Sequence, residues 1–527
     1  MGINRRQLIV SSGASAASLA IGHHFARAVG GSSFTLGVAS GEPTPDGFVL
    51  WTRLASSPLA PDGQGGMADP VSVAWEVAND EGMRTVVRRG SVEADGRLAH
   101  SVHVEVAGLE PNRPYWYRFT ALGEQSPIGR ARTAPAPNAR LDRLRFAFAS
   151  CSNWQHGYFS AYRHMAEENP DLVLFLGDYI YEFTYTGGGA DRVVRPHDGA
   201  TATDLTGYRN RYALYRSDPD LRALHAAASC LITWGDHEVE NDYADEWSQV
   251  IATPPAAFLQ RRAAAYQAFY EHMPLRARAV PRNSALRLHE RFRFGDLVSF
   301  SVLDGRQYRS KQPCELPTTR RGHIAPDSCT ERIDPNRTLL GPEQEQWLFE
   351  GFKQSDAAWN ILAQEQLVAD LRQKDRLGAY GHWTDGWDGY PAARQRVLDA
   401  MVATRLVNPS VLVGLDEPRA VRLRHVETDY RAHDAWSPGG GLDGPRQAQQ
   451  GCWQEPGTAG SLSCRPRILR ALRAARPRAA AAGVAGGRAS VRTPGEPAGR
   501  AQCARQVDRR RGDERAHPRS RAALTHG

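Results

Sequence analysis

The stretch Gly177-Asp178-Tyr179-Ile180-Tyr181 carries a carboxylate and, three residues later, a phenol, and both groups can bind metal ions. It follows residues 172–176, an apolar run that predicts a buried parallel strand. Open α/β sheets bind ligands at the carboxyl ends of their strands. Asp178 could therefore bridge two cations with Tyr181 binding one of them. A strand-ending turn with a surface aspartate is the alternative interpretation.

Two other predicted strands end in residues that can do similar chemistry. Residues 144–149 run into Cys151, whose thiolate could bind a metal or whose side chain could simply fill the core. Residues 230–234 are followed by Gly235, Asp236, His237 and Glu238. A solvated acidic loop would explain that last group without any function. Because three strands end in potential ligands, we predict that their tips converge on one site.

Several motifs in this order resemble those of the PhoD-type alkaline phosphatases/phosphodiesterases, metallophosphoesterases that are distantly similar to purple acid phosphatases. The matching segments are 148–153, 157–159, 176–182, 234–241, 303–309, 359–366 and 387–394. The resemblance runs from about Phe34 to about Gly414. It implies a small phosphate-ester substrate and a site that holds Fe³⁺ and Ca²⁺.

Hydrolysis of a phosphate ester by a metal-activated water or hydroxide fits a pair of cations that share one carboxylate. We predict that Asp178 is shared, that Cys151 and Tyr181 bind one cation, and that Asp236 binds the other. A phenolate and a thiolate favour ferric iron, whereas the oxygen of Asp236 suits calcium. His237 is expected to orient these ligands rather than to bind metal.

Arg306 has two interpretations, because its guanidinium could hold a phosphate oxygen or form an ion pair with Asp304. We include it with Asp178, Asp236 and His237 among the candidate catalytic residues. Trp387, Asp388 and Tyr390 also match the family, but core packing at the start of a helix is the favoured explanation for these residues.

The pattern along the chain predicts two folded regions. Residues 34–134 alternate between apolar and polar positions, which predicts a small all-β domain of fibronectin-III or immunoglobulin type with a corner tyrosine. Residues 141–414 alternate between strands and helices, which predicts a layered α/β sandwich of the metallophosphoesterase type. Helices are expected at 161–167, 255–272, 342–353 and 391–406, with a hairpin over 292–304.

The first 30 residues resemble a twin-arginine signal peptide. Arg5 and Arg6 precede a weakly apolar stretch that reaches about Ile21, and Ala26-Arg27-Ala28 fits a cleavage site. We therefore expect export by the Tat machinery to the periplasm or the outside of the cell. No other stretch is apolar enough for a transmembrane segment. In an exported protein, a disulfide between Cys314 and Cys329 is plausible because they flank a loop-like segment.

The net charge of +7 comes from the last part of the chain. Residues 415–527 contain 21 Arg and no Lys against 11 acidic residues, whereas the preceding part is slightly acidic. The charge therefore gives no case for a specific nucleic-acid partner. From Gln454 onward there is no Phe, Trp or Tyr, a composition that predicts a disordered tail over 415–527.

The family pattern breaks after the predicted strand that ends at Gly414. An Asp-x-His motif is expected there, but the chain reads Leu415-Asp416-Glu417-Pro418, and proline offers no ligand atom. A frameshift in a GC-rich gene and a genuine basic tail are two explanations. Two functions therefore stand side by side: an exported alkaline phosphatase or phosphodiesterase, and a truncated or frameshifted relative that lacks a complete metal site and is catalytically impaired.

Overall fold

The computed structural model describes residues 32–67, 70–185, 193–316, 321–375 and 377–414, and three two-residue strands farther on. All of them belong to the first of two compact units, Met1–Ala474. The expected signal peptide and, apart from those three strands, the expected tail lie outside the described residues. Within the described part, no helix combines the length and the apolar character that crossing a membrane requires.

A six-stranded sheet carries the segments that were singled out from the sequence. Its strand order is β10-β11-β12-β1-β2-β5, and β10, β11 and β12 run parallel. The bounds are β1 Val38–Thr44, β2 Gly47–Arg53, β5 Ser101–Val106, β10 Phe146–Ala149, β11 Leu172–Leu176 and β12 Cys230–Thr233. Every residue of β11 is buried, as expected for a parallel strand covered on both faces.

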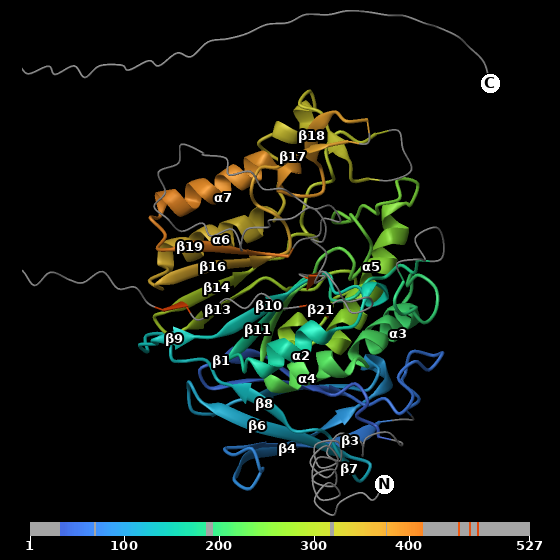
Figure 1. Cartoon of the computed structure of the whole chain (residues 1–527), viewed down its shortest axis with the longest axis vertical. Coiled ribbons are helices and arrows are strands. Elements are labelled where there is room, and N and C mark those ends of the chain that lie inside the picture. Colours follow the sequence, from blue (N-terminus) through green and yellow to red (C-terminus); the bar gives the residue numbers. More distant parts are fainter. Residues whose placement is uncertain are drawn as a thin grey trace, which may run out of the picture. The chain divides into compact units, whose positions relative to one another are not determined.

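A second sheet has the order β13-β14-β16-β19 (Figure 1). Its strands are β13 Glu290–Phe294, β14 Val298–Val302, β16 Trp359–Gln364 and β19 Pro409–Val413. β13 and β14 pair antiparallel, which confirms the predicted hairpin, while β14, β16 and β19 are parallel. The parallel strands of this sheet therefore also bring their carboxyl ends to one edge.

The two sheets pack face to face through one apolar core. Leu172, Leu174 and Leu176 of β11 meet Phe300 of β14 and Ile361 of β16 in the same cluster. On the outer face of the first sheet, aromatic and aliphatic side chains of the helices that follow β10, β11 and β12 form a second core. A third core joins the second sheet to the helices beside it in Figure 1. This arrangement is the predicted layered α/β sandwich.

Except for α2, the helices begin where the sequence provides a capping carboxylate or a proline. Their bounds are α2 Ser160–Glu167, α3 Leu205–Arg216, α4 Pro219–Ala227, α5 Pro255–His272, α6 Pro342–Gln354 and α7 Pro391–Ala403. The carboxylates of Asp204 and Asp218 accept backbone N–H groups at the first turns of α3 and α4. The four predicted helices are present with ends that differ by a few residues, whereas α3 and α4 were not predicted.

The N-terminal strands form a β-sandwich, but one of its sheets extends into the region 141–414. β1 pairs with β12 through Gly41 and Cys230, so β1, β2 and β5 continue the six-stranded sheet. The opposing sheet contains β3 Val71–Ala78, β4 Val86–Ala94, β6 Pro114–Ala121, β7 Glu124–Gln125 and β8 Gly129–Arg132. Side chains of both sheets share one apolar core. The regions 34–134 and 141–414 are therefore joined by backbone pairing as well as by the linker.

Short elements complete the described chain. The remaining strands are β9 Arg143–Leu144, β15 Ile324–Ala325, β17 Arg372–Lys374, β18 Tyr380–Trp383, β20 Cys452–Trp453, β21 Ser463–Cys464 and β22 Leu472–Arg473. The short 3₁₀ helices are η2 Gly96–Leu98, η3 Trp154–His156, η5 Ala277–Ala279, η6 Thr330–Ile333 and η7 Trp387–Gly389. Trp387 in η7 and Tyr390 directly after it are buried in the third core, which confirms the packing role predicted for them. Asp388, for which packing was also predicted, instead forms an ion pair with Arg394 and accepts the backbone N–H of Leu371 at 2.9 Å.

The predicted disulfide between Cys314 and Cys329 is present and closes a loop with a sequence separation of 15. We expect the double variant Cys314→Ser/Cys329→Ser to lose about 3 kcal/mol of unfolding free energy, because the unfolded chain regains the entropy of the open loop. Urea denaturation of oxidised protein measures this loss. A reductant should destabilise the native chain by a similar amount and leave the double variant unchanged; an equal response of both proteins would contradict the expectation.

Candidate functional site

The ends of β10, β11 and β12 come together as the sequence predicted. Ala149 of β10 is level with Phe175 of β11, and Leu176 of β11 is level with Thr233 of β12. Beyond the strands, the N–H of Cys151 donates to the carbonyl of Gly177 at 3.2 Å. The first sheet therefore delivers its candidate residues to one edge.

Two glycines allow the tips of β11 and β12 to approach each other. Gly177 has a φ of +92°, and a Cβ atom there would lie 2.5 Å from the backbone nitrogen of Gly235. A Cβ atom on Gly235 would lie 2.3 Å from Oδ1 of Asp178 and 2.7 Å from Oε2 of Glu365. A larger residue at position 235 would therefore collide with two carboxylates. Glycine is required here by close approach rather than by turn formation alone.

Three carboxylate oxygens at this edge have no hydrogen-bond partner although they are buried. They are Oδ1 of Asp178, Oδ1 of Asp236 and Oε2 of Glu365. Asp178, Asp236 and His237 also place ligand atoms within 4.8 Å of one another. A buried anionic oxygen without a partner is costly, and a cation is the partner that would satisfy several at once. The residues present therefore fit a metal site.

Asp236 belongs to a second such group with Asp242 and Asp385. All three are buried, and Asp236 Oδ2 accepts the backbone N–H of Asp242 at 2.6 Å. Burial, together with the charge of Asp385, raises the pKa of Asp242 well above its usual range. The edge of the sheet therefore gathers more carboxyl groups than the first group alone, and their mutual repulsion favours the neutral form of Asp242.

Arg306 lies at the centre of this negative charge and is fully buried. Its Nε donates to Glu365 Oε1 at 2.5 Å and its Nη1 donates to Asp385 Oδ2 at 2.7 Å. A third ion pair joins its Nη2 to Oδ2 of Asp236 at 3.7 Å. Of the two interpretations of Arg306, the ion pair with Asp304 is therefore wrong: Asp304 Oδ1 accepts the backbone N–H of Arg306 instead. The sequence could not distinguish these partners because they come from three separate segments.

The pKa values of the two aspartates at the strand ends are shifted in opposite directions. Burial raises the pKa of Asp178 to about 6, and the charge of Asp236 adds to this effect. Burial would also raise the pKa of Asp236, but Arg306 and His237 hold it at about 2. Burial alone would lower the pKa of His237, but the carboxylates of Asp236 and Glu182 raise it well above the usual range. The carboxylates around His237 therefore favour its protonated form.

Glu238 fixes the strand ends rather than facing the group of unpartnered oxygens. Its carboxylate accepts the backbone N–H groups of Asp178 at 3.2 Å, Tyr179 at 2.6 Å and Gly235 at 2.7 Å. Burial and the charge of Asp178 raise its pKa to about 8. One side chain thus ties the segment after β11 to the segment after β12. The neighbouring His237 is held in turn by Glu182, with 2.7 Å between Nδ1 and Oε2.

Tyr181 and Cys151 reach this edge in different ways. The hydroxyl of Tyr181 donates to Oδ2 of Asp178 at 3.1 Å, so the predicted pair is in contact. Cys151 is half-buried. In the described chain, its Sγ is not among the groups of thiol, imidazole and carboxylate atoms that lie within 4.8 Å of one another. Cys151 is therefore brought near by its backbone, whereas Asp178, Asp236 and His237 are brought together by their side chains.

The sequence did not identify Glu365 or Asp385 as members of the site. Glu365 follows β16 and so comes from the second sheet, whose packing against the first cannot be derived from local pattern. Asp385 lies between β18 and η7. The signal that could have found Glu365 was its position directly after a strand, within a segment that already matched the family.

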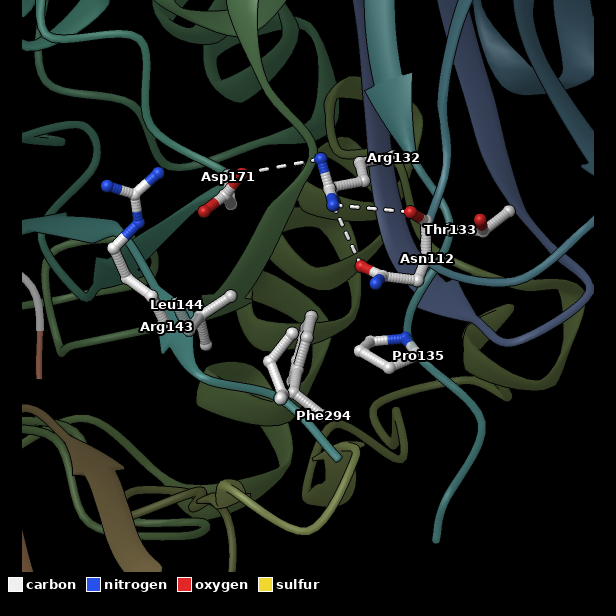
Figure 2. A pocket seen from close by; sticks show the side chains of 9 residues that line it. Asn112, Arg132, Thr133, Pro135, Arg143, Leu144, Asp171 and Phe294 are labelled. Atoms are coloured by element: carbon white, nitrogen blue, oxygen red, sulfur yellow. Dashed lines mark hydrogen bonds and ion pairs between the residues drawn. The ribbon is translucent and has the colours of Figure 1, made fainter. Parts of the chain in front are cut away.

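Another pocket, away from this edge, is too small to bind a substrate. Arg132 points toward Asp171 and Asn112 in Figure 2, with 3.7 Å between Arg132 Nη1 and Asp171 Oδ1. Arg132 Nη2 donates to Asn112 Oδ1 at 2.8 Å. The enclosed volume is about 10 Å³, which leaves room for about one water molecule. The polar groups in this pocket satisfy one another, unlike those at the strand ends.

Comparison with known proteins links this geometry to one family. The family model described as PhoD-like phosphatase matches residues 146–433, and that of its N-terminal domain matches residues 17–135. Alkaline phosphatase D of Bacillus subtilis (strain 168) is 46% identical over 428 residues, which cover 78% of this chain and 70% of that protein. A solved structure described as "Structure of PhoD" has a TM-score of 0.68 and 48% identity, and the match covers 74% of this chain and 72% of that chain. The family match continues beyond Gly414, where the sequence motifs led us to end the resemblance.

Removing Arg306 tests whether it compensates the buried carboxylates. We expect Arg306→Met to lower the unfolding free energy by about 3–5 kcal/mol, because Asp236, Glu365 and Asp385 would stay buried without their shared cation. Urea denaturation in the presence of a chelator measures this loss. The control Arg372→Met breaks an exposed ion pair with Asp327 and should cost no more than about 1 kcal/mol. Equal losses in the two variants would contradict the role of Arg306.

Proposed function

Because this chain belongs to the PhoD-like phosphatase family and is therefore a phosphoric ester hydrolase, we propose that it acts on phosphate mono- or diesters as an exported, metal-dependent enzyme. The observation that carries the proposal is the set of three buried, unpartnered carboxylate oxygens of Asp178, Asp236 and Glu365. A site of this kind has the negative charge that cations require and lies at the strand ends where α/β proteins bind ligands.

Cys151, Asp178 and Tyr181 would hold Fe³⁺, and Asp236 would hold Ca²⁺, with Asp178 shared between the two cations. When bound, such cations supply a water-derived nucleophile at alkaline pH and neutralise negative charge on the phosphoryl group. The contact between the Tyr181 hydroxyl and Asp178 Oδ2 supports the first group. Glu365, which the sequence did not suggest, is a further candidate ligand because its Oε2 is one of the unpartnered oxygens.

His237 and Arg306 act on the site as fixed positive charges. Both are buried, and each is held by carboxylates that face the site from separate segments. Positive charge in a site with little water attracts an anionic ester and opposes the mutual repulsion of the aspartates. We propose that Arg306 is a positioning residue, since three carboxylates already contact its guanidinium. His237 likewise orients the ligands rather than binding a cation.

The region 34–134 is proposed to be a structural domain of fibronectin-III or immunoglobulin type, followed by the catalytic region 141–414. Its support is the corner tyrosine: the hydroxyl of Tyr115 accepts the backbone N–H of Glu110 at 2.9 Å. A tyrosine bonded to the backbone a few residues upstream is a feature of such sandwiches. The proposed twin-arginine signal over residues 1–30 would direct the folded enzyme to the Tat machinery, and thus to the periplasm or the outside of the cell.

A second candidate function is that of an impaired relative with an incomplete metal site. The observation in its favour is Pro418, which stands where the family pattern requires a histidine. This position lies outside the described residues. The carboxylates of both sheets come from residues before Gly414, so this candidate predicts a folded protein with reduced metal content and little turnover.

The central test combines turnover with metal content. We expect the purified chain to hydrolyse p-nitrophenyl phosphate or bis-p-nitrophenyl phosphate at pH 8–9 with calcium. Asp178→Ala should lose turnover and metal together, because the shared carboxylate is gone; elemental analysis for iron and calcium measures the second effect.

The control for this test is Asp356→Ala, which removes an exposed carboxylate paired with Arg293. It should retain both turnover and metal. Native iron content in Asp178→Ala would show that the shared ligand lies elsewhere. A folded native chain without turnover or iron would favour the impaired relative.

The proposed iron ligand Tyr181 can be tested by colour. Charge transfer from a tyrosinate to Fe³⁺ should give the purified protein a visible absorption band and a purple colour. We expect Tyr181→Phe to lose this band while keeping its fold, since the ring remains. Tyr158→Phe, at an exposed tyrosine, is the matched control and should keep the band. A band that survives in Tyr181→Phe would exclude this tyrosine as the ligand.

A further inference from the structure

The segment after β11 places three aromatic rings in a row that begins at the candidate site. Tyr181, Phe183 and Tyr185 recur at every second position in a stretch without helix. The ring centroids of Tyr181 and Phe183 are 5.7 Å apart, and those of Phe183 and Tyr185 are 4.8 Å apart. We call these three rings the aromatic row.

The inner end of the aromatic row contacts residues of the candidate site. The Tyr181 ring lies 4.2 Å from that of His237, and the Phe183 ring lies 5.2 Å from it. The outer end reaches the surface, because Tyr185 is 41% exposed. The row therefore leads from the unpartnered carboxylates outward to solvent.

The aromatic row is held in place rather than loosely packed. Arg211 of α3 is buried and donates to the carbonyls of Tyr181 at 2.6 Å and Phe183 at 3.0 Å. The backbone N–H of Tyr185 donates to Gln155 Oε1 at 2.8 Å. The ring of Tyr185 is also stacked on that of His156, with 5.4 Å between centroids and 26° between planes. A ligand that uses this surface would not have to order it first.

We propose that the aromatic row binds a planar ring on the alcohol part of the ester, a specificity that rests on the proposed phosphate-ester hydrolysis. Aromatic side chains bind flat unsaturated rings by offset stacking or edge-to-face contact. Two ring contacts, His237 to Phe183 and Phe183 to Tyr185, separate the candidate site from the exposed end of the row. A substrate whose phosphate lies at the site and whose ring lies on Tyr185 therefore needs a short spacer between its ring and its ester oxygen. The substrate class is therefore phosphate esters of ring-bearing alcohols.

Packing alone would not leave the last ring of the row accessible. The ring planes of Phe183 and Tyr185 make an angle of 84°, an edge-to-face contact, and the His156 ring stacks on Tyr185. Tyr185 is nevertheless 41% exposed to solvent. Tyr185 thus differs from Tyr179 and Tyr215, which are buried in the core, and from other exposed tyrosines such as Tyr380, which lie outside a row of rings that begins at the candidate site. The fixed position and the exposure of Tyr185 together point to a contact with ligand.

The test compares three substrates whose leaving alcohols are similarly basic. They are 3-phenylpropyl phosphate, 3-cyclohexylpropyl phosphate and propyl phosphate. The native enzyme should show the highest kcat/KM for the phenyl ester. In Tyr185→Ala, the preference for the phenyl over the propyl ester should fall roughly 2-fold to 12-fold, mainly through KM, because one aromatic contact is removed. Tyr185→Phe keeps the ring and should keep the preference.

The control Tyr380→Ala removes another exposed tyrosine, whose ring contacts Lys374, and should leave the ratio unchanged. An unchanged preference in Tyr185→Ala, or an equal loss for the cyclohexyl and phenyl esters, overturns the proposal. Hydrolysis of none of the three esters would count against the proposed function instead. In that case, calorimetry with 4-phenylbutylphosphonate tests the aromatic row by itself. Weaker binding to Tyr185→Ala than to the native protein supports the proposal, and equal binding to the two proteins overturns it.

Discussion

The structure depends on the neutralisation of carboxylates that are gathered where little water can reach them. Asp178, Asp236, Glu365 and Asp385 are all buried at one edge of the two sheets, and Arg306 is the guanidinium that contacts three of them. Isolated buried charges are strongly unfavourable, so a cluster with more anions than cations persists only if further positive charge is available. His237 supplies part of that charge, and the unpartnered oxygens indicate where the rest is missing. Cations bound as we propose would relieve this imbalance.

This cluster requires two strands to approach more closely than side chains normally allow. Gly177 and Gly235 remove the Cβ atoms that would collide at the tips of β11 and β12. Glu238 then joins both tips through three backbone N–H groups. The Gly-Asp pairs that drew attention in the sequence thus have a double role: the glycine permits contact between strands, and the aspartate after it uses that contact. Neither residue would serve the site without the other.

The sequence predicted the parts of the site that depend on one strand at a time. An apolar run followed by Gly-Asp is enough to place Asp178 or Asp236 at the end of a parallel strand. Sequence reasoning failed where a contact depends on how two sheets pack, as for Glu365 after β16 and for the partners of Arg306. It also missed α3 and α4, although Asp204 and Asp218 cap them in the ordinary way. The β-sandwich was anticipated, but its continuation into the catalytic sheet rests on a single residue pair, Gly41 and Cys230, that no local pattern indicates.

The segment after β11 serves chemistry and recognition with the same few residues. Asp178 begins it at the strand tip, and the aromatic row follows within one short stretch of chain. Arg211 reaches this stretch from α3 and binds the carbonyls of Tyr181 and Phe183, so a helix outside the group of carboxylates helps to determine where the rings lie. His237 contacts the row on one side and Glu182 on the other. A shift of the row would therefore move the His237 ring, which lies among the carboxylates, so the proposed substrate preference and the electrostatics of the centre are linked.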